Sequence, residues 1–210
     1  MQILELCGPE LAPYLDRLGQ LRITVFAEYP YLYEGSLDSE REYLSSYLTS
    51  PQSLVALVLH HEAVVGATTC LPMLDEQPAF QQPFIQARYD LASLCYFGES
   101  VLLPPYRGQG LSHEFFRRRE AHARRLGAKH TTFCAVDRPQ DHPSRPPDYR
   151  PLDALWQRQG YVKHPELKAT FSWKEPHTPT ETQKQLTFWL KEELMNAIVL
   201  SRQNGSSKNY

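Results

Sequence analysis

Residues 95–112 of this 210-residue chain read Cys-Tyr-Phe-Gly-Glu-Ser-Val-Leu-Leu-Pro-Pro-Tyr-Arg-Gly-Gln-Gly-Leu-Ser. The part that ends at Leu103 is apolar and rich in strand-favouring residues, and the two prolines after it cannot extend a strand ladder. From Leu111 to Leu126, apolar side chains recur at helical spacing. The stretch therefore predicts a strand, a tight bend, a glycine-containing loop and the start of a helix.

The glycines stand where the predicted helix begins. The first N–H groups of a helix have no partner within it, and they lie at the positive end of its dipole. Gly108 and Gly110 carry no Cβ atom that would hold a bulky anion away. The junction predicts a phosphate or pyrophosphate site, with main-chain donors on Gly108, Gln109, Gly110, Leu111 and Ser112. An ordinary glycine-containing helix start would explain the two glycines equally well.

The longer pattern is more specific. Arg-x-x-Gly-x-Ser, after a strand ending Val-Leu-Leu-Pro, resembles the acetyl-CoA motif Arg/Gln-x-x-Gly-x-Gly/Ala of the GNAT N-acetyltransferases. Arg107 and Gly110 match this motif, and Ser112 departs from its last position. The resemblance covers residues 3–194. It implies an α/β fold with a mostly antiparallel mixed sheet, splayed fourth and fifth strands and helices on both faces. It also implies acetyl-CoA as cosubstrate, with Arg107 and the amides after it on the pyrophosphate.

The resemblance assigns further roles along the strand. The main chain of Val101 and Leu102 would pair with the pantetheine arm, as an added strand does. Glu99, two residues before Val101, matches the carboxylate that some members use as general base. An acid inside an apolar strand must be solvated or paired, and burial raises its pKa toward the range of a useful base. A Glu paired with a neighbouring Arg or His is the alternative. We expect alternate residues of this strand on alternate faces.

A second segment is similar to the family near Gly160 and Tyr161. In the family, a tyrosine four residues before this glycine protonates the leaving thiolate. Here that position is Trp156, which cannot donate in that way. We place Trp156 at the cofactor and Tyr149 as the substitute acid, with proton delivery by water equally suitable.

Two loops are expected near the acceptor. Tyr29, Tyr31 and Tyr33 surround one proline, and they could either cover a core edge or wall an amine pocket through flat contact and cation–π attraction. The resemblance favours the pocket, because the first two helices frame the acceptor cleft. The segment 137–150 carries many prolines together with Asp, His and Arg, which predicts a loop and a candidate lid.

The remaining pattern predicts the other elements. Leu11, Leu15, Leu18, Arg22 and Val25 lie on one side of a predicted helix that runs from Pro9 to Phe26. The other predictions are a strand at 2–7, a helix at 38–47 capped by Asp38 or Ser39, a hairpin of strands 54–59 and 63–71, a helix or irregular insertion at 77–91, a strand at 129–136, a helix at 152–159 and strands around 168–173 and 185–194. Arg119 and His122 stand unexplained inside the apolar stripe of the helix 111–126.

Composition limits the function classes. A net charge of −2 argues against a nucleic-acid partner, and no apolar run approaches the ~20 residues of a membrane span. The N-terminus lacks the pattern of a signal peptide, and four scattered cysteines indicate reduced, buried thiols, so we expect a cytoplasmic protein without metal. We expect one domain over residues 1–194 and a disordered tail over 195–210. The oligomeric state stays open, with a homodimer among the options.

Three functions remain open at this stage. The first is acetyl transfer from acetyl-CoA to a primary amine of a small molecule, with Glu99 as the candidate base. The second is a non-catalytic acyl-CoA sensor, supported by the tryptophan at position 156. The third is a nucleotide-phosphate binder that uses the glycine loop alone, although the chain has no Gly-Lys-Ser/Thr sequence for a P-loop.

Overall fold

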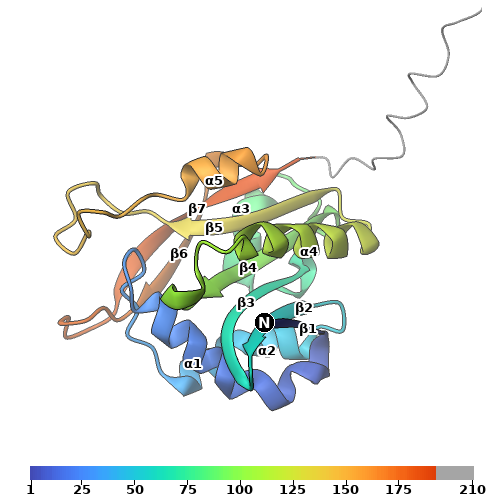
Figure 1. The fold of residues 1–210 in the computed structure, drawn as a ribbon. Helices are drawn as coiled ribbons and strands as arrows, with labels where there is room; N and C mark the ends of the chain where they lie inside the picture. The colour runs from blue at the N-terminus through green and yellow to red at the C-terminus, as the bar shows by residue number, and fades with distance from the viewer. Residues whose placement is uncertain (193–210) are drawn as a thin grey trace, which may run out of the picture.

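The computed structural model describes residues 1–192, and this part of the chain forms a seven-stranded sheet in the order β1-β2-β3-β4-β5-β7-β6 (Figure 1). Neighbouring strands are antiparallel except for β4 and β5, which are parallel. The strands are β1 Gln2–Leu6, β2 Leu54–His60, β3 Ala63–Pro72, β4 Leu94–Leu102, β5 His130–Val136, β6 Val162–Trp173 and β7 Thr182–Lys191.

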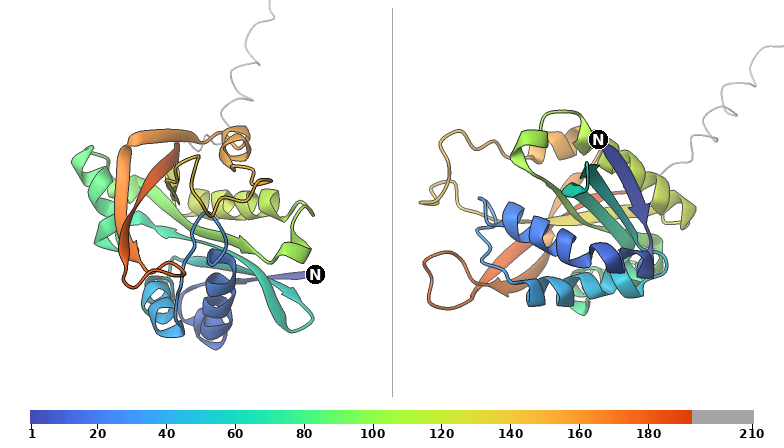
Figure 2. Two further views of the ribbon diagram at one scale, coloured as in Figure 1. Left: turned by 90° about the vertical axis from the view of Figure 1, so that its left-hand side faces the viewer. Right: turned by 60° about the horizontal axis from the view of Figure 1, so that its bottom comes forward.

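Helices cover both faces of this sheet, as Figure 2 shows. The α-helices are α1 Leu15–Phe26, α2 Leu37–Thr49, α3 Pro78–Gln86, α4 Leu111–Arg125 and α5 Asp153–Arg158. Helix α4 packs over β2, β3 and β4, and α1 packs on the opposite face of β3 and β4 with α2 beside it. Each face therefore has its own apolar core, one containing Leu18, Leu44 and Phe84, the other Phe97, Phe116 and Trp189. The predicted α/β mixed-sheet fold is confirmed.

The β4–α4–β5 unit sets the shape of the centre. Pairing between β4 and β5 joins Leu94–Tyr96 to His130–Thr132 and ends there. Beyond this point β4 continues to pair with β3, while β5 pairs with β7. The two central strands therefore separate toward their carboxyl ends, which confirms the predicted splay.

Several boundaries differ from the prediction. The helix expected from Pro9 to Phe26 begins as a 3₁₀ helix over Gly8–Tyr14, and α1 begins only at Leu15, because Pro13 has no N–H for an α-helical bond. The cap of α2 is Ser36, whose Oγ accepts from the N–H of Ser39 at 3.2 Å, so the predicted caps Asp38 and Ser39 were wrong.

The remaining elements follow the prediction with shifted ends. The hairpin of β2 and β3 is confirmed, and the insertion before β4 contains the helix α3. Strand β6 begins at Val162, six residues earlier than expected, because an irregular register between His164 and Lys168 allows the ladder to continue past a mismatch. Residues 193–194 of the last predicted strand and the whole predicted tail lie outside the described residues. The single domain over 1–194 stays a prediction.

Candidate functional site

A cavity of about 1120 Å³ opens where β4 and β5 separate. Because backbone pairing between the two strands stops at Tyr96, the opening divides the sheet itself. The cavity is lined by these predicted site residues: Glu99, Leu102, Arg107, Gly108, Gly110, Leu111, Ser112, Tyr29, Tyr31, Tyr149 and Trp156. Three predicted residues do not line it: Val101 is buried in the core, the Gln109 side chain donates to the carbonyl of Pro105, and Tyr33 lines a second cavity.

The mouth of this cavity is the glycine loop before α4. Gly108 and Gly110 have φ of +76° and +81°, a region that other residues rarely adopt, and a Cβ at either position would meet nothing within 4 Å. The main-chain N–H groups of residues 108–112 have no hydrogen-bond acceptor within the described residues. An open cradle of unpaired N–H groups at a helix start fits a pyrophosphate.

Arg107 already has protein partners at this mouth. Its Nε donates to the carbonyl oxygen of Leu102 at 2.9 Å, and its Nη2 lies 2.9 Å from Glu28 Oε2, in the loop after α1. The side chain is 44% exposed, so the guanidinium remains accessible to a ligand. The carbonyl of Leu102, which was predicted to pair with pantetheine, is therefore engaged by Arg107 in this structure.

A bulge in β4 decides where Glu99 points. Thr68 pairs with Ser100, and Cys70 pairs with Phe97. Between these two pairs, β4 therefore contains one residue more than β3. The extra residue reverses the alternation, because Phe97 packs on the α4 side and Glu99 contacts Arg22 of α1 on the other side. The predicted simple alternation of faces along this strand was wrong. An isolated glycine in a strand, Gly98, was the signal for the bulge.

Glu99 is paired and deeply buried, with 4% of its surface exposed. Its Oε2 accepts from Arg22 Nη1 at 2.5 Å and from the hydroxyl of Tyr43 at 3.3 Å, while Oε1 has no hydrogen-bond partner within residues 1–192. Burial raises the pKa of Glu99 above its ordinary value, and the positive charge of Arg22 lowers it in part. The alternative of a paired carboxylate is thus observed, and the pairing leaves one oxygen free.

Arg22 binds a second carboxylate that the sequence prediction missed. Its Nε donates to Glu40 of α2, so one buried guanidinium faces two carboxylates, and its Cζ atom lies 4.0 Å from the centre of the Tyr43 ring. The apolar stripe of α1 already contained Arg22 as its one charged member. A charge inside such a stripe signals a buried partner. The partner itself lies too far away in sequence to be read from the pattern.

A third buried acid lies near this group. Both carboxyl oxygens of Glu76 are buried without a hydrogen-bond partner in the described part of the chain. Burial, together with the nearby charge of Glu99, raises the pKa of Glu76 to about 8. Glu76 therefore carries its proton at neutral pH.

The polar residues inside the stripe of α4 also have buried partners. The Arg119 guanidinium lies between the rings of Phe97 and Phe116, at 4.4 and 4.8 Å from their centres. His122 Nε2 lies 2.8 Å from the carbonyl oxygen of Gln52. Both residues fix α4 against the sheet, which explains their place on its apolar face.

The two residues considered for proton donation differ in setting. Trp156 packs edge-on against Phe133 and Trp189, with ring centres 5.1 and 5.0 Å away. Tyr149 comes from the loop 137–150 and packs edge-on against Tyr29 at 4.7 Å. Burial raises the pKa of Tyr149, so its hydroxyl stays protonated at neutral pH. Both side chains line the large cavity, and of these two only Tyr149 carries a hydroxyl.

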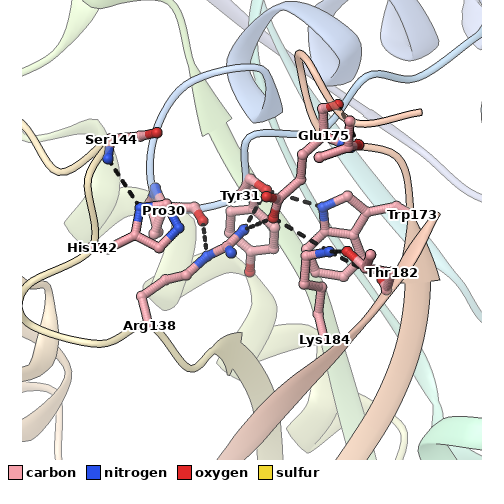
Figure 3. A network of polar contacts seen from close by, with 10 residues as sticks. Pro30, Tyr31, Arg138, His142, Ser144, Trp173, Glu175, Thr182 and Lys184 are labelled. Carbon is pink, nitrogen blue, oxygen red and sulfur yellow. Dashed lines mark hydrogen bonds and ion pairs between the residues drawn. The ribbon is translucent and has the colours of Figure 1, made fainter. Parts of the chain in front are cut away.

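One buried arginine joins the loops around the cavities, as Figure 3 shows. Arg138 donates to the carbonyl oxygens of Pro30 and Tyr31 at 2.6 and 2.8 Å, and it pairs with Glu175 at 2.6 Å. The carbonyl of Tyr31 also accepts from Trp173 Nε1 at 3.0 Å. The three tyrosines predicted to bind the acceptor do not share one cavity. Tyr29 and Tyr31 line the large cavity, and Tyr31 and Tyr33 line a second, smaller one.

Residues 1–192 contain no cluster of three or more His, Cys, Asp or Glu side chains arranged to hold a metal ion. The four cysteines are free thiols, and Cys70, Cys95 and Cys134 are buried. Among the described helices, none combines the length and the apolarity that a membrane crossing requires.

Solved structures supply the comparison, since no protein-family model and no curated protein matches this sequence. A ribosomal-protein-alanine N-acetyltransferase from Brucella melitensis is 13% identical, with a TM-score of 0.57 over 91% of this chain and 99% of that one. An N-acetyltransferase from Staphylococcus aureus Mu50 is 11% identical, with a TM-score of 0.56 over 91% and 99%.

A third neighbour was solved with acetyl-CoA. It is yncA from Salmonella typhimurium, described as a candidate acetyltransferase, and it is 10% identical with a TM-score of 0.56 over 94% of this chain and 97% of its own. At such low identities these similarities concern the fold. The fold that the resemblance implied is thereby confirmed: this chain has the GNAT acetyltransferase fold.

Proposed function

We propose that this protein is an acetyl-CoA-dependent N-acetyltransferase that acts on a primary amine of a small molecule. The observation that carries the proposal is the large cavity between the splayed strands, with the glycine loop at its mouth and Glu99 on its wall. A neighbour of the same fold was solved with acetyl-CoA. A large cavity with an anion cradle at its mouth and an acid on its wall supports such a reaction.

Different parts of the cavity would hold different parts of acetyl-CoA. Arg107 and the N–H groups of residues 108–112 would hold the pyrophosphate. The main chain near Val101 and Leu102 would pair with the pantetheine amides, and Arg107 would release the Leu102 carbonyl for this purpose. Trp156 and Phe133 present apolar surface beside this path. When bound, acetyl-CoA supplies the acetyl group as a thioester.

The residues of this chain then serve the transfer in three ways. Glu99 accepts the proton that the amine loses as its nitrogen bonds to the acetyl carbon, directly or through one water. A main-chain N–H near Val101 stabilises the negative charge that develops on the carbonyl oxygen. The carbon–sulfur bond breaks, and Tyr149 or a water returns a proton to the sulfur. Correct placement of both reactants contributes up to roughly 7–11 kcal/mol of rate enhancement.

Thermal stability with and without ligands tests the cofactor. CoA and acetyl-CoA at about 100 times their Kd are expected to stabilise the fold by roughly 2.7 kcal/mol, and ATP is expected to stabilise it little. Arg107→Gln should weaken CoA binding about ten- to hundredfold, because a charge-assisted contact is lost. Arg117→Gln, on the exposed side of α4, is the control and should bind normally. A shift with ATP in place of CoA would instead support a nucleotide-phosphate binder.

The second function is a non-catalytic acyl-CoA sensor, which is favoured by one observation. Trp156 stands at the position of the thiolate acid and is packed between Phe133 and Trp189. A sensor would bind acetyl-CoA and release no CoA with any amine. Amine-dependent CoA release separates the two functions: an enzyme should release CoA and be slowed strongly by Glu99→Gln, whereas a sensor should release none with either chain.

A further inference from the structure

A second cavity of about 190 Å³ lies on the face of the sheet that α1, α2 and α3 cover. It meets the large cavity at Phe26, Tyr31, Gly98 and Cys134, which line both. An acceptor held in the second cavity would therefore meet the acetyl group at this junction. The chemistry of the lining then indicates which acceptor fits, provided that the proposed acetyl transfer is correct.

The size of the second cavity fits a small acceptor group. Clefts that bind drug-sized ligands usually measure roughly 300–1,000 Å³, and a closed apolar cavity of about 150 Å³ is enough for one benzene ring. At about 190 Å³, the second cavity takes a single ring with a short side chain.

The walls of the second cavity are flat and apolar. Most of the residues that line it are aromatic: Phe26, Tyr31, Tyr33, Tyr43, Phe80, Tyr96, Phe171 and Trp173. The ring of Phe80 lies 4.8 Å from that of Tyr96 and 4.5 Å from that of Phe171, and Trp173 stacks on Tyr31 at 6.1 Å. Aromatic rings prefer such offset and edge-on neighbours, so these walls favour a flat aromatic guest over a flexible polar one.

The charges beside the second cavity favour one ammonium group. Arg22 is the one guanidinium of the lining, and it already contacts the carboxylates of both Glu40 and Glu99. Two carboxylates against one guanidinium leave a negative surplus, and Glu99 keeps one oxygen without a partner in the described chain. Glu40 is the one carboxylate that lines the small cavity itself. The negative surplus therefore matches an acceptor with one ammonium group. The further charges of a polyamine would have no carboxylate partner in this cavity.

We propose that the acceptor is a primary arylalkylamine, that is, a single aromatic ring joined to an amine by a short alkyl chain. The ring lies among Phe80, Phe171 and Trp173, and the amine points to the junction at Gly98. This proposal rests on the proposed acetyl transfer and makes it specific.

A matched series of amines tests the acceptor class. CoA release is measured with 2-phenylethylamine, n-hexylamine, spermidine and kanamycin as acceptors, together with the thermal shift that each amine causes without CoA. We expect kcat/KM for 2-phenylethylamine to be at least about tenfold higher than for the other three, because only this amine places a flat ring in the aromatic cavity. A higher kcat/KM for spermidine or kanamycin would overturn the proposal.

Variants at Trp173 locate the ring. Trp173→Leu should raise KM for 2-phenylethylamine about tenfold and leave the Kd for CoA unchanged, since Trp173 lines only the small cavity. Trp173→Phe keeps a ring but loses the hydrogen bond to Tyr31, and it should restore most of the affinity. If both variants lose affinity equally, Trp173 acts through Tyr31 alone and its contact with the acceptor is refuted.

The thermal shift with CoA and the CoA release with amines together distinguish a wrong acceptor class from a wrong reaction. A normal thermal shift with CoA, combined with no preference for the aromatic amine, would overturn the arylalkylamine and leave acetyl transfer standing. An absent shift with CoA and no CoA release with any amine would overturn acetyl transfer, and the acceptor proposal with it.

Discussion

Arg107 Nη2 lies 2.9 Å from Glu28 Oε2, so the arginine of the acetyl-CoA motif is already paired across the mouth of the large cavity. The two side chains are 44% and 45% exposed, and exposed ion pairs contribute only about 0–1 kcal/mol. A pyrophosphate at the glycine loop therefore competes with a weakly held carboxylate for one guanidinium. The strength of this competition is measurable.

Glu28→Gln is expected to bind CoA up to about fivefold more tightly than the natural chain, because the competing carboxylate charge is gone. Titration calorimetry at low and high salt measures the effect, which should shrink as salt screens the pair. Glu34→Gln is the control, since Glu34 pairs with Lys174 and lines neither cavity. Weaker binding by Glu28→Gln would show that Glu28 supports the ligand.

Glu99→Gln is expected to lower kcat by about 10²–10⁴-fold with little change in CoA affinity, because an amide cannot accept the amine proton. Stopped or continuous detection of released CoA gives the rate. Glu120→Gln is the matched control: Glu120 is a buried acid paired with Lys191 and Arg124, and it does not line either cavity. An equal loss of kcat in both variants would point to a structural role for Glu99.

The pH profile of kcat/KM gives a further test of Glu99. Only the deprotonated carboxylate accepts a proton, so the rate must fall as the pH drops through its pKa. Because burial raises the pKa of Glu99, this fall should lie above the ordinary glutamate value of about 4.3. The Glu99→Gln variant should lose this acid-side fall. A fall that persists in the variant would assign it to another group.

Glu76 makes stability depend on pH in the opposite sense to most acids. Its folded pKa is about 8, well above the ordinary glutamate value of 4.5, so the folded state binds more protons than the unfolded state between these values. The free energy of unfolding should therefore fall as pH rises through this window, by up to about 1.4 kcal/mol per pH unit.

Urea denaturation of Glu76→Gln at several pH values measures this effect. A neutral amide removes the titration, so the variant should lose most of the decline and be the more stable protein above pH ~8. Glu62→Gln, at an exposed position, should keep the natural profile. A Glu76→Gln variant with an unchanged pH slope would refute the buried acid as its source.

Gly98→Ala should destabilise the fold by about 1–3 kcal/mol through overpacking. A Cβ at this position would lie 1.8 Å from the Tyr47 hydroxyl oxygen and 2.6 Å from Thr69 Oγ1. Tyr47→Phe removes the nearer atom, costs little alone because that hydroxyl has no hydrogen-bond partner within residues 1–192, and should partly rescue Gly98→Ala. The free energy of unfolding is measured for the natural chain, the two single variants and the double variant. If the two single effects simply add in the double variant, Tyr47 does not clash with the new Cβ.

Local patterns in the sequence were enough to predict the centre of the fold. The apolar run ending at Leu103, the prolines after it and the helical spacing from Leu111 determine a strand, a loop and a helix that depend on neighbours in sequence. The parallel partner β5 follows from the short helical crossover. Cofactor residues on this unit were therefore predicted together, and the structure places most of them on one cavity.

Contacts between distant segments could not be predicted. Glu99 and Arg22 are 77 residues apart, and the face that Glu99 occupies depends on a bulge whose register is set by β3. The second cavity could not be predicted for the same reason, because its walls come from three helices and four strands that are distant in sequence. A pattern along one segment shows that a side chain is unusual, and only the folded chain shows which partner makes it stable.

Arg138 lines neither cavity, yet its guanidinium holds the backbone of Pro30 and Tyr31 and the carboxylate of Glu175. Arg138 therefore joins the loops after α1, after β5 and after β6 at one point, beside the contacts of Trp173 with Tyr31 and of Lys174 with Glu34. Laboratory selection for new acceptors is expected to act on Arg138 as well as on the cavity walls, since a substitution there would shift the loops around both cavities without altering a residue that lines either one.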